Sequence, residues 1–168
     1  GASRWLIDTG EGRREYVHLL RQAMEDEGVT GLEGILLTHY HGDHTGGLGD
    51  VRAMLKDMGV ESPVLAYKRI RRDHGERAVR THDNPGGDVD DPTRSRCYAA
   101  VADGAIFRCE GATIRALHTP GHTPDHVVFT LEEEGSMFAG DCVLNGNTAT
   151  FEDLGEYTES LKKMAQEL

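Results

Sequence analysis

The sequence predicts a single α/β domain in which helices cover mixed β-sheets. Short apolar segments typical of strands alternate with segments whose apolar residues recur at helical spacing, several strands then follow one another closely, and a helix comes last. This order differs from the uniform strand–helix alternation of a doubly wound parallel sheet. The length of 168 residues and the hydrophobic content of 38% suit one domain with one sizeable core.

The first part of the chain alternates between strands and helices. Gly28 and Gly59 follow the two segments with helical spacing, at the position where a glycine often ends a helix. Asp8-Thr9-Gly10 is a turn signal after the first apolar segment. The expected strands are 5–7, 34–38 and 64–67, and the expected helices are 14–27 and 48–58.

The character of the chain changes at residues 68–96, which are charged, contain Gly and Pro, and are poor in apolar residues. We expect this segment to be a long surface loop or insertion within the domain that spans residues 1–168. Strand-like segments resume after it, and Glu132-Glu133-Glu134-Gly135 fits a hairpin connection between the last two. The expected strands are 105–107, 113–117, 126–131 and 136–139, followed by a helix at 151–166.

The net charge argues against binding to duplex nucleic acid through a basic face. Acidic residues number 29 against 18 basic ones, which gives a formal charge of -11. Such a surface repels a polyanion at long range, although bound metal dications would reverse the sign locally. Arg69, Arg71 and Arg72 form a basic cluster that is either a solvated face or a place for a phosphate.

Cysteine usage and hydropathy bear on the compartment. Cys97, Cys109 and Cys142 are scattered and odd in number, which suits free thiols better than a disulfide framework. We therefore expect the cytoplasm or the mitochondrial matrix. No run of residues approaches the roughly 18–20 apolar residues of a membrane span, so no membrane partner is expected.

The segment His39-Tyr40-His41-Gly42-Asp43-His44 holds four possible metal ligands and directly follows an apolar strand. Alternate side chains of an extended segment point the same way, so His39 and His41 can face one metal together. Asp43 and His44 come after the turn at Gly42 and can face a second metal. Imidazole and carboxylate together suit zinc, with iron or manganese as alternatives.

Two later segments supply further ligands. His122 lies in a glycine- and proline-containing turn that follows the expected strand 113–117, and Asp141 comes just after the strand 136–139. Ligands delivered from several strand ends onto one sheet edge are what a rigid two-metal site needs. His126 either orients the turn that holds His122 or has a purely structural role.

Together these motifs resemble those of the metallo-β-lactamase superfamily. The resemblance implies an αββα sandwich and a site for two zinc ions. It implies that the first metal is held by His39, His41 and His122, and the second by Asp43 and His44, with Asp141 bridging both. Asp8 then lies beneath the site and orients a ligand. The implied chemistry is metal-dependent hydrolysis, with Asp43 and Asp141 as the catalytic residues that hold and orient the attacking water.

More narrowly, the segments 121–126, 140–144 and 151–154 resemble the β-lactamase-like protein 2 group. That group includes animal endonucleases for single-stranded RNA and fungal thioesterases that act beside polyketide synthases. The resemblance favours single-stranded RNA as the substrate. The alternatives are a small-molecule thioester, of the polyketide-synthase, acyl-CoA or glyoxalase type, and a catalytically incomplete fragment that binds metal.

The chain also departs from the family pattern at both ends. We expect a partial domain, because no glycine-rich strands precede Asp8 and no Pro-Gly-His-type motif follows Leu161 to complete the second metal site. Sheet edges without neighbours would favour self-association or pairing with a missing segment.

Overall fold

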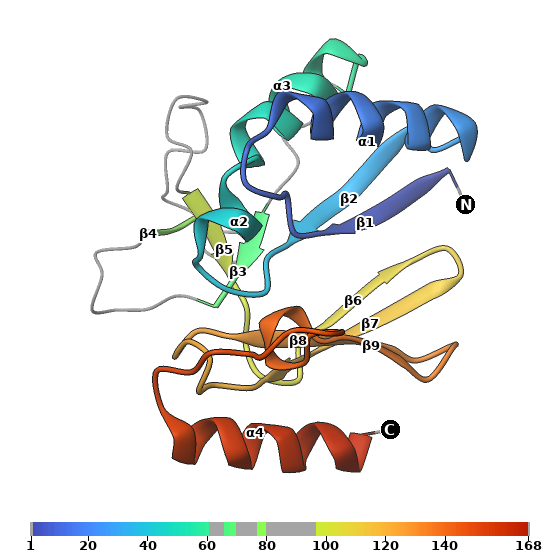
Figure 1. The fold of residues 1–168 in the computed structure, drawn as a ribbon. Helices are drawn as coiled ribbons and strands as arrows, with labels where there is room; N and C mark the ends of the chain where they lie inside the picture. Colours follow the sequence, from blue (N-terminus) through green and yellow to red (C-terminus); the bar gives the residue numbers. More distant parts are fainter. Residues whose placement is uncertain (1, 61–65, 70–76, 80–96, 168) are drawn as a thin grey trace.

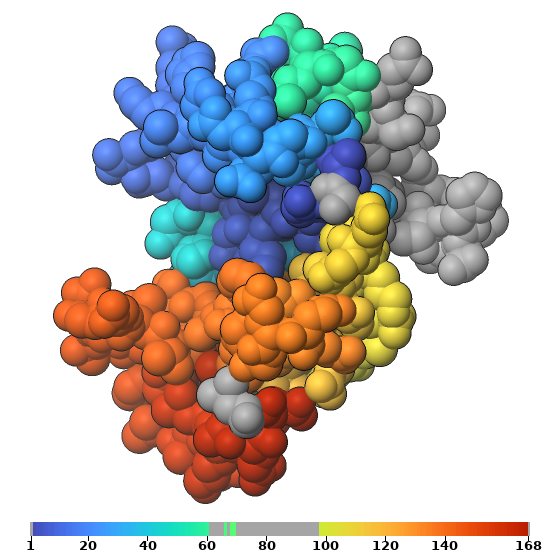
Figure 2. Space-filling model, turned by 90° about the vertical axis from the view of Figure 1, so that its right-hand side faces the viewer, coloured from blue at the N-terminus to red at the C-terminus, as the bar shows by residue number. Residues whose placement is uncertain are grey.

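Two β-sheets lie face to face, with helices on both outer faces (Figure 1). The structure is a computed structural model, and it describes residues 2–60, 66–69, 77–79 and 97–167. The four layers form the αββα sandwich that the sequence predicts. Figure 2 shows the N-terminal half in blue and the C-terminal half in yellow to red, stacked on one another.

The first sheet is parallel and has the strand order β1-β2-β3-β5-β4. Helices α1 (Arg14–Asp26) and α3 (Leu48–Asp57) pack on its outer face. Parallel strands need crossover connections, and these two helices provide them between the first strands. The strands are β1 (Ser3–Ile7), β2 (Gly31–Leu36), β3 (Ala66–Lys68), β4 (Arg77–Val79) and β5 (Cys97–Ala100).

The second sheet is antiparallel and has the order β6-β7-β8-β9. Helix α4 (Leu154–Glu167) lies along its outer face, as the bottom layer of Figure 1 shows. The strands are β6 (Ile106–Cys109), β7 (Ala112–His118), β8 (Val127–Leu131) and β9 (Ser136–Phe138).

Alternation along the strands builds the core. On β8, Val127 and Phe129 point between the two sheets, whereas Val128 points outward and packs with Met164 of α4. Leu36 of β2 belongs to the same layer between the sheets. Successive side chains of a strand point to opposite faces, so strands covered on both faces are apolar at every position. This is why these strands appear in the sequence as continuous apolar runs.

Most predicted elements are present, but the segment 68–96 differs in part from the predicted loop. Lys68 belongs to β3, and Arg77–Val79 forms β4, which pairs with β5. A three-residue strand depends on its neighbours, and its own sequence carries no period that would predict it. Residues 70–76 and 80–96 of the predicted loop lie outside the described residues. Within the described ranges, no helix is both long and apolar enough to span a membrane.

Candidate metal centre

The first sheet delivers one group of site residues from the ends of its first two strands. Asp8 directly follows β1, and Thr38 and His39 follow β2. The chain then turns into the short helix α2 (Gly42–Thr45), whose first turn holds Asp43 and His44. Parallel neighbours end at the same edge of a sheet, so these side chains meet there.

The second sheet delivers the other residues. His122 lies in the turn between β7 and β8, and Asp141 lies in the 3-10 turn Gly140–Cys142 that follows β9. A backbone hydrogen bond of 2.8 Å from the Val127 N–H to the Thr38 carbonyl joins the two layers beside the site. The site is therefore built across the two sheets.

Three histidines and one carboxylate form the first cluster. Nε2 of His39 lies 2.9 Å from Nδ1 of His41 and 3.2 Å from Nε2 of His122. Nε2 of His122 lies 3.2 Å from Nδ1 of His41 and 3.5 Å from Oδ2 of Asp141. Ligands of a tetrahedral zinc ion with bonds of about 2.0–2.1 Å lie about 3.3–3.4 Å apart. The donor types and their spacing therefore fit one metal ion.

A second cluster lies beside the first and shares Asp141 with it. Nε2 of His44 lies 3.2 Å from Oδ1 of Asp141 and 3.6 Å from Oδ2 of Asp43. Asp141 thus turns one carboxylate oxygen to each cluster. The structure brings all six predicted ligand residues together in these two groups.

Hydrogen bonds turn the rings of His122 and His44 so that their Nε2 atoms face the clusters. Nδ1 of His122 lies 2.8 Å from the Thr150 carbonyl, and Nδ1 of His44 lies 2.7 Å from Oδ2 of Asp8. Because a carbonyl and a carboxylate only accept, both nitrogens carry the proton. Their Nε2 atoms then keep a free lone pair, which is the form that binds a metal.

Asp8 is the central acceptor beneath the site. Its carboxylate also accepts hydrogen bonds from the backbone N–H and the hydroxyl of Thr38. Asp8 has a φ of 58°, in the left-handed region that residues other than glycine seldom adopt. Such strained residues persist where the surroundings fix them, often at functional sites. In this conformation the Asp8 carboxylate lies within hydrogen-bond distance of both Thr38 and His44.

His126 supports Asp141 from below. It is fully buried, and its Nε2 accepts a hydrogen bond of 3.2 Å from the Asp141 backbone N–H. A Cβ at Gly140 would lie 2.7 Å from the same Nε2, so only glycine fits at that position. This contact, together with the 3.0 Å contact between its Nδ1 and the Thr119 hydroxyl in the turn that holds His122, favours the hypothesis that His126 orients part of the site.

Burial and neighbouring charge tune the protonation of these rings. Burial lowers the pKa of His39, and burial together with the nearby His122 lowers the pKa of His126 to about 3. Burial acts to lower the pKa of His44 too, but the hydrogen bond and charge of Asp8 outweigh it and raise that pKa. At neutral pH the His39 and His126 rings are therefore uncharged.

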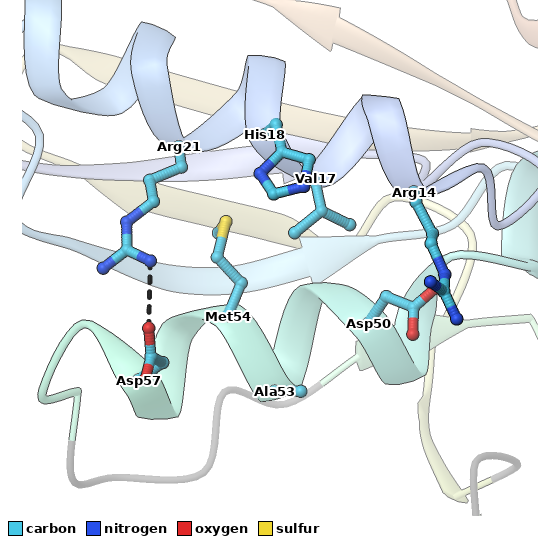
Figure 3. Close-up of a pocket in the computed structure, with 8 residues that line it drawn as sticks. All are labelled: Arg14, Val17, His18, Arg21, Asp50, Ala53, Met54 and Asp57. Carbon is cyan, nitrogen blue, oxygen red and sulfur yellow. Dashed lines mark hydrogen bonds and ion pairs between the residues drawn. The ribbon is translucent and has the colours of Figure 1, made fainter.

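A hollow of about 330 Å³ lies on another face of the molecule, between α1 and α3. Figure 3 shows Arg21 of α1 paired with Asp57 of α3 at one end of this hollow. Its lining shares no residue with the two histidine clusters. The hollow is therefore separate from the candidate metal centre.

Comparison with known proteins decides the family. The family model of the metallo-β-lactamase superfamily matches residues 3–167. The chain belongs to the metallo-β-lactamase superfamily. This membership agrees with the predicted fold and with the predicted class, a metal-dependent hydrolase.

A curated relative of this superfamily member is an atrochrysone carboxyl ACP thioesterase of Pseudocercospora fijiensis. The two are 38% identical over 167 residues, which cover 99% of this chain and 42% of the relative. The chain thus spans less than half the length of that relative.

Solved structures show the same fold. A metallo-β-lactamase family protein from Thermus thermophilus matches with a TM-score of 0.67 and 24% identity, over 96% of this chain and 60% of that one. A protein solved in a di-iron-bound form matches with a TM-score of 0.61 and 23% identity, over 95% of this chain and 74% of that one.

Sequence reasoning missed the residues that orient the ligands through the backbone or through hydroxyl groups. Thr38 bonds to Asp8 and lies 3.0 Å from Nδ1 of His39, yet a threonine at the end of a strand is common and carries no signal in the sequence. Thr150 contributes only its carbonyl oxygen to His122. No side-chain pattern could reveal that contribution.

Proposed function

We propose that this chain carries the metal centre of a thioester hydrolase. The observation that carries the proposal is the position of Asp141, whose two carboxylate oxygens face two adjacent ligand clusters. Zinc suits the imidazole and carboxylate donors, and iron or manganese are alternatives. When bound, two such ions supply a water nucleophile near neutral pH and polarise the carbonyl under attack.

The chain's own residues have separate roles in this proposal. His39, His41 and His122 would hold the first ion, and His44 with Asp43 would hold the second. Asp141 turns one carboxylate oxygen toward each cluster and would be shared between them. Asp43 and Asp141 accept hydrogen bonds from the attacking water and so orient it. The Asp43 side chain is 64% exposed, which leaves it accessible to solvent.

Three observations favour a thioester over RNA. The curated relative is named as a thioesterase, and the formal charge of -11 disfavours a polyanion. Three exposed apolar side chains are also close in sequence to residues of the site. Tyr40 lies between His39 and His41, Val143 lies two residues after Asp141, and Phe151 follows Thr150. Such side chains suit an acyl group. The thioester alternative is therefore better supported than cleavage of single-stranded RNA, which the sequence resemblance favoured.

The basic cluster that favoured RNA gives it little structural support. Arg69 is described and half-buried, whereas Arg71 and Arg72 lie outside the described residues. Neither the comparisons nor the described contacts support self-association. The compartment expected from the cysteines, cytoplasm or mitochondrial matrix, stays a proposal.

The test measures thiol release from an N-acetylcysteamine thioester of an aromatic acid, using zinc-loaded chain. We expect release that stops on adding a chelator and is abolished in Asp141→Asn. The control Asp57→Asn removes the same charge from an exposed carboxylate on α3 and should keep full activity. Cleavage of a single-stranded RNA without thiol release would refute the thioester proposal. Absence of both activities in zinc-loaded chain would instead favour the incomplete metal-binding fragment.

A further inference from the structure

A buried ion pair lies close to the metal centre but contains none of its ligands. Nζ of Lys68 is 2.7 Å from Oδ2 of Asp125, and each residue is only 1% exposed. Nζ also lies 5.5 Å from the centre of the Tyr98 ring. Taking a lysine and a carboxylate out of water is costly, and apolar residues of similar size often stabilise a fold at least as well. A buried pair of this kind therefore needs a reason other than stability.

The pair joins the two sheets at the point where the site is assembled. Lys68 ends β3, which pairs with β2, the strand that leads into His39. Asp125 lies in the turn between β7 and β8, the same turn that holds His122. The Thr123 hydroxyl donates a hydrogen bond of 2.8 Å to Oδ1 of Asp125. The carboxylate thus connects Lys68 to the residue next to His122.

We propose that the Lys68–Asp125 pair positions His122 against His39 and His41. The inference rests on the proposed metal centre, in which one ligand comes from the second sheet and two from the first. Apolar packing between the sheets is non-directional, so polar contacts such as the backbone hydrogen bond from Val127 to Thr38 add directional restraints on their relative position. The 2.7 Å ion pair, with the Thr123 hydroxyl bonded to the same carboxylate, ties the turn to the end of β3 and so restrains where His122 lies relative to the first sheet.

A neutral double variant separates positioning from stability. Lys68→Met with Asp125→Asn keeps the side-chain volumes, removes both charges together and leaves no unpaired buried ion. The matched control is Arg21→Met with Asp57→Asn, which makes the same change of charge at the exposed pair of 2.9 Å between α1 and α3. Lys68→Arg keeps the positive charge and tests whether any cation at this place is enough to hold His122 in position.

Metal affinity and geometry are the measurements. We expect the double variant in its metal-free form to unfold at about the same temperature as the unsubstituted chain. Its first-site zinc affinity, measured by competition with a chromophoric chelator, should fall about 10–100-fold, as is typical for residues that orient ligands. The visible absorption of the cobalt-loaded protein should change with it. The control should match the unsubstituted chain in both, and Lys68→Arg should lose less affinity than the double variant.

Two results would overturn the inference. One is a folded double variant with unchanged zinc affinity and an unchanged cobalt spectrum. The other is a double variant that fails to fold, because the pair would then maintain the fold and not the position of His122. If the unsubstituted chain binds no zinc tightly, the proposed metal centre itself is wrong. Tight zinc binding without thioester hydrolysis would contradict the proposed reaction and leave this inference standing.

Discussion

Gly121 should tolerate alanine much less well than other glycines with positive φ. Its φ is 125°, and a Cβ there would lie 2.2 Å from the backbone nitrogen and 2.3 Å from the Cα of Tyr157 in α4. Gly135 also has a positive φ, 56°, but a Cβ there would meet nothing within 4 Å. Both substitutions place a side chain at positive φ, and because 125° lies outside the left-handed region in which Gly135 sits, the backbone cost at Gly121 is at least as large. Only Gly121→Ala must also move the helix or the turn.

The magnitudes follow from these two costs. A side chain in the left-handed region costs roughly 1–2 kcal/mol, and this is all that Gly135→Ala should lose. Overpacking adds about 1–3 kcal/mol for Gly121→Ala. The gain from a stiffer unfolded chain is common to both variants and cancels. For a chain of this size the difference corresponds to roughly 2–12 °C in melting temperature.

The assay is thermal unfolding of both variants, followed by circular dichroism without metal. Gly121 also accepts backbone hydrogen bonds of 2.7 Å from Glu152 and 3.1 Å from Asp153, so a displaced turn should weaken the segment that leads into α4. Gly121→Ala with a melting temperature at or above that of Gly135→Ala would refute the reasoning, because the close approach to Tyr157 would then carry no cost.

Three further outcomes are expected. Calorimetric titration of zinc into metal-free chain should show one tight and one weaker binding event. The second cluster binds more weakly because it has three donors and its Asp43 is 64% exposed. Two equally tight events would contradict this expectation. Burial lowers the pKa values of His39 and His126, the latter to about 3, so these rings take up protons when the chain unfolds below about pH 6.5. Metal-free chain should therefore be most stable above about pH 6.5 and lose stability toward pH 5. A melting temperature that does not change over this range would count against the argument. Burial raises the pKa of Cys142 to about 11, so mass-mapped alkylation of folded chain should modify the partly exposed Cys109 first; equal rates would show that the core opens readily.

Local spacing made part of the metal centre predictable. His39 and His41 are two residues apart after an apolar strand, and this spacing alone places their rings on one side. The apolar runs of β2 and β8 likewise predict strands covered on both faces. These features depend only on neighbours in the chain, so a single sequence is enough to find them.

Features that depend on distant partners could not be predicted. Lys68 opens a charged stretch of sequence and would ordinarily be placed in solvent, yet Asp125 makes its burial possible. Strand β4 forms because it pairs in parallel with β5, which is distant in the sequence. The Thr150 carbonyl reaches His122 only after the chain has passed through the whole second sheet. None of these has a local pattern.

The division of the ligands between the two sheets has a consequence for how the protein is made. His39, His41 and His44 leave the ribosome well before His122 and Asp141, so the early half of the nascent chain presents an open, half-formed ligand set. The chain can bind the metal tightly only after the second sheet has docked, so metal binding stabilises only the docked form. The metal would thus act late in biogenesis. It would stabilise a tertiary structure that has already formed and would not nucleate its folding. In a refolding experiment, zinc should slow unfolding much more than it speeds folding.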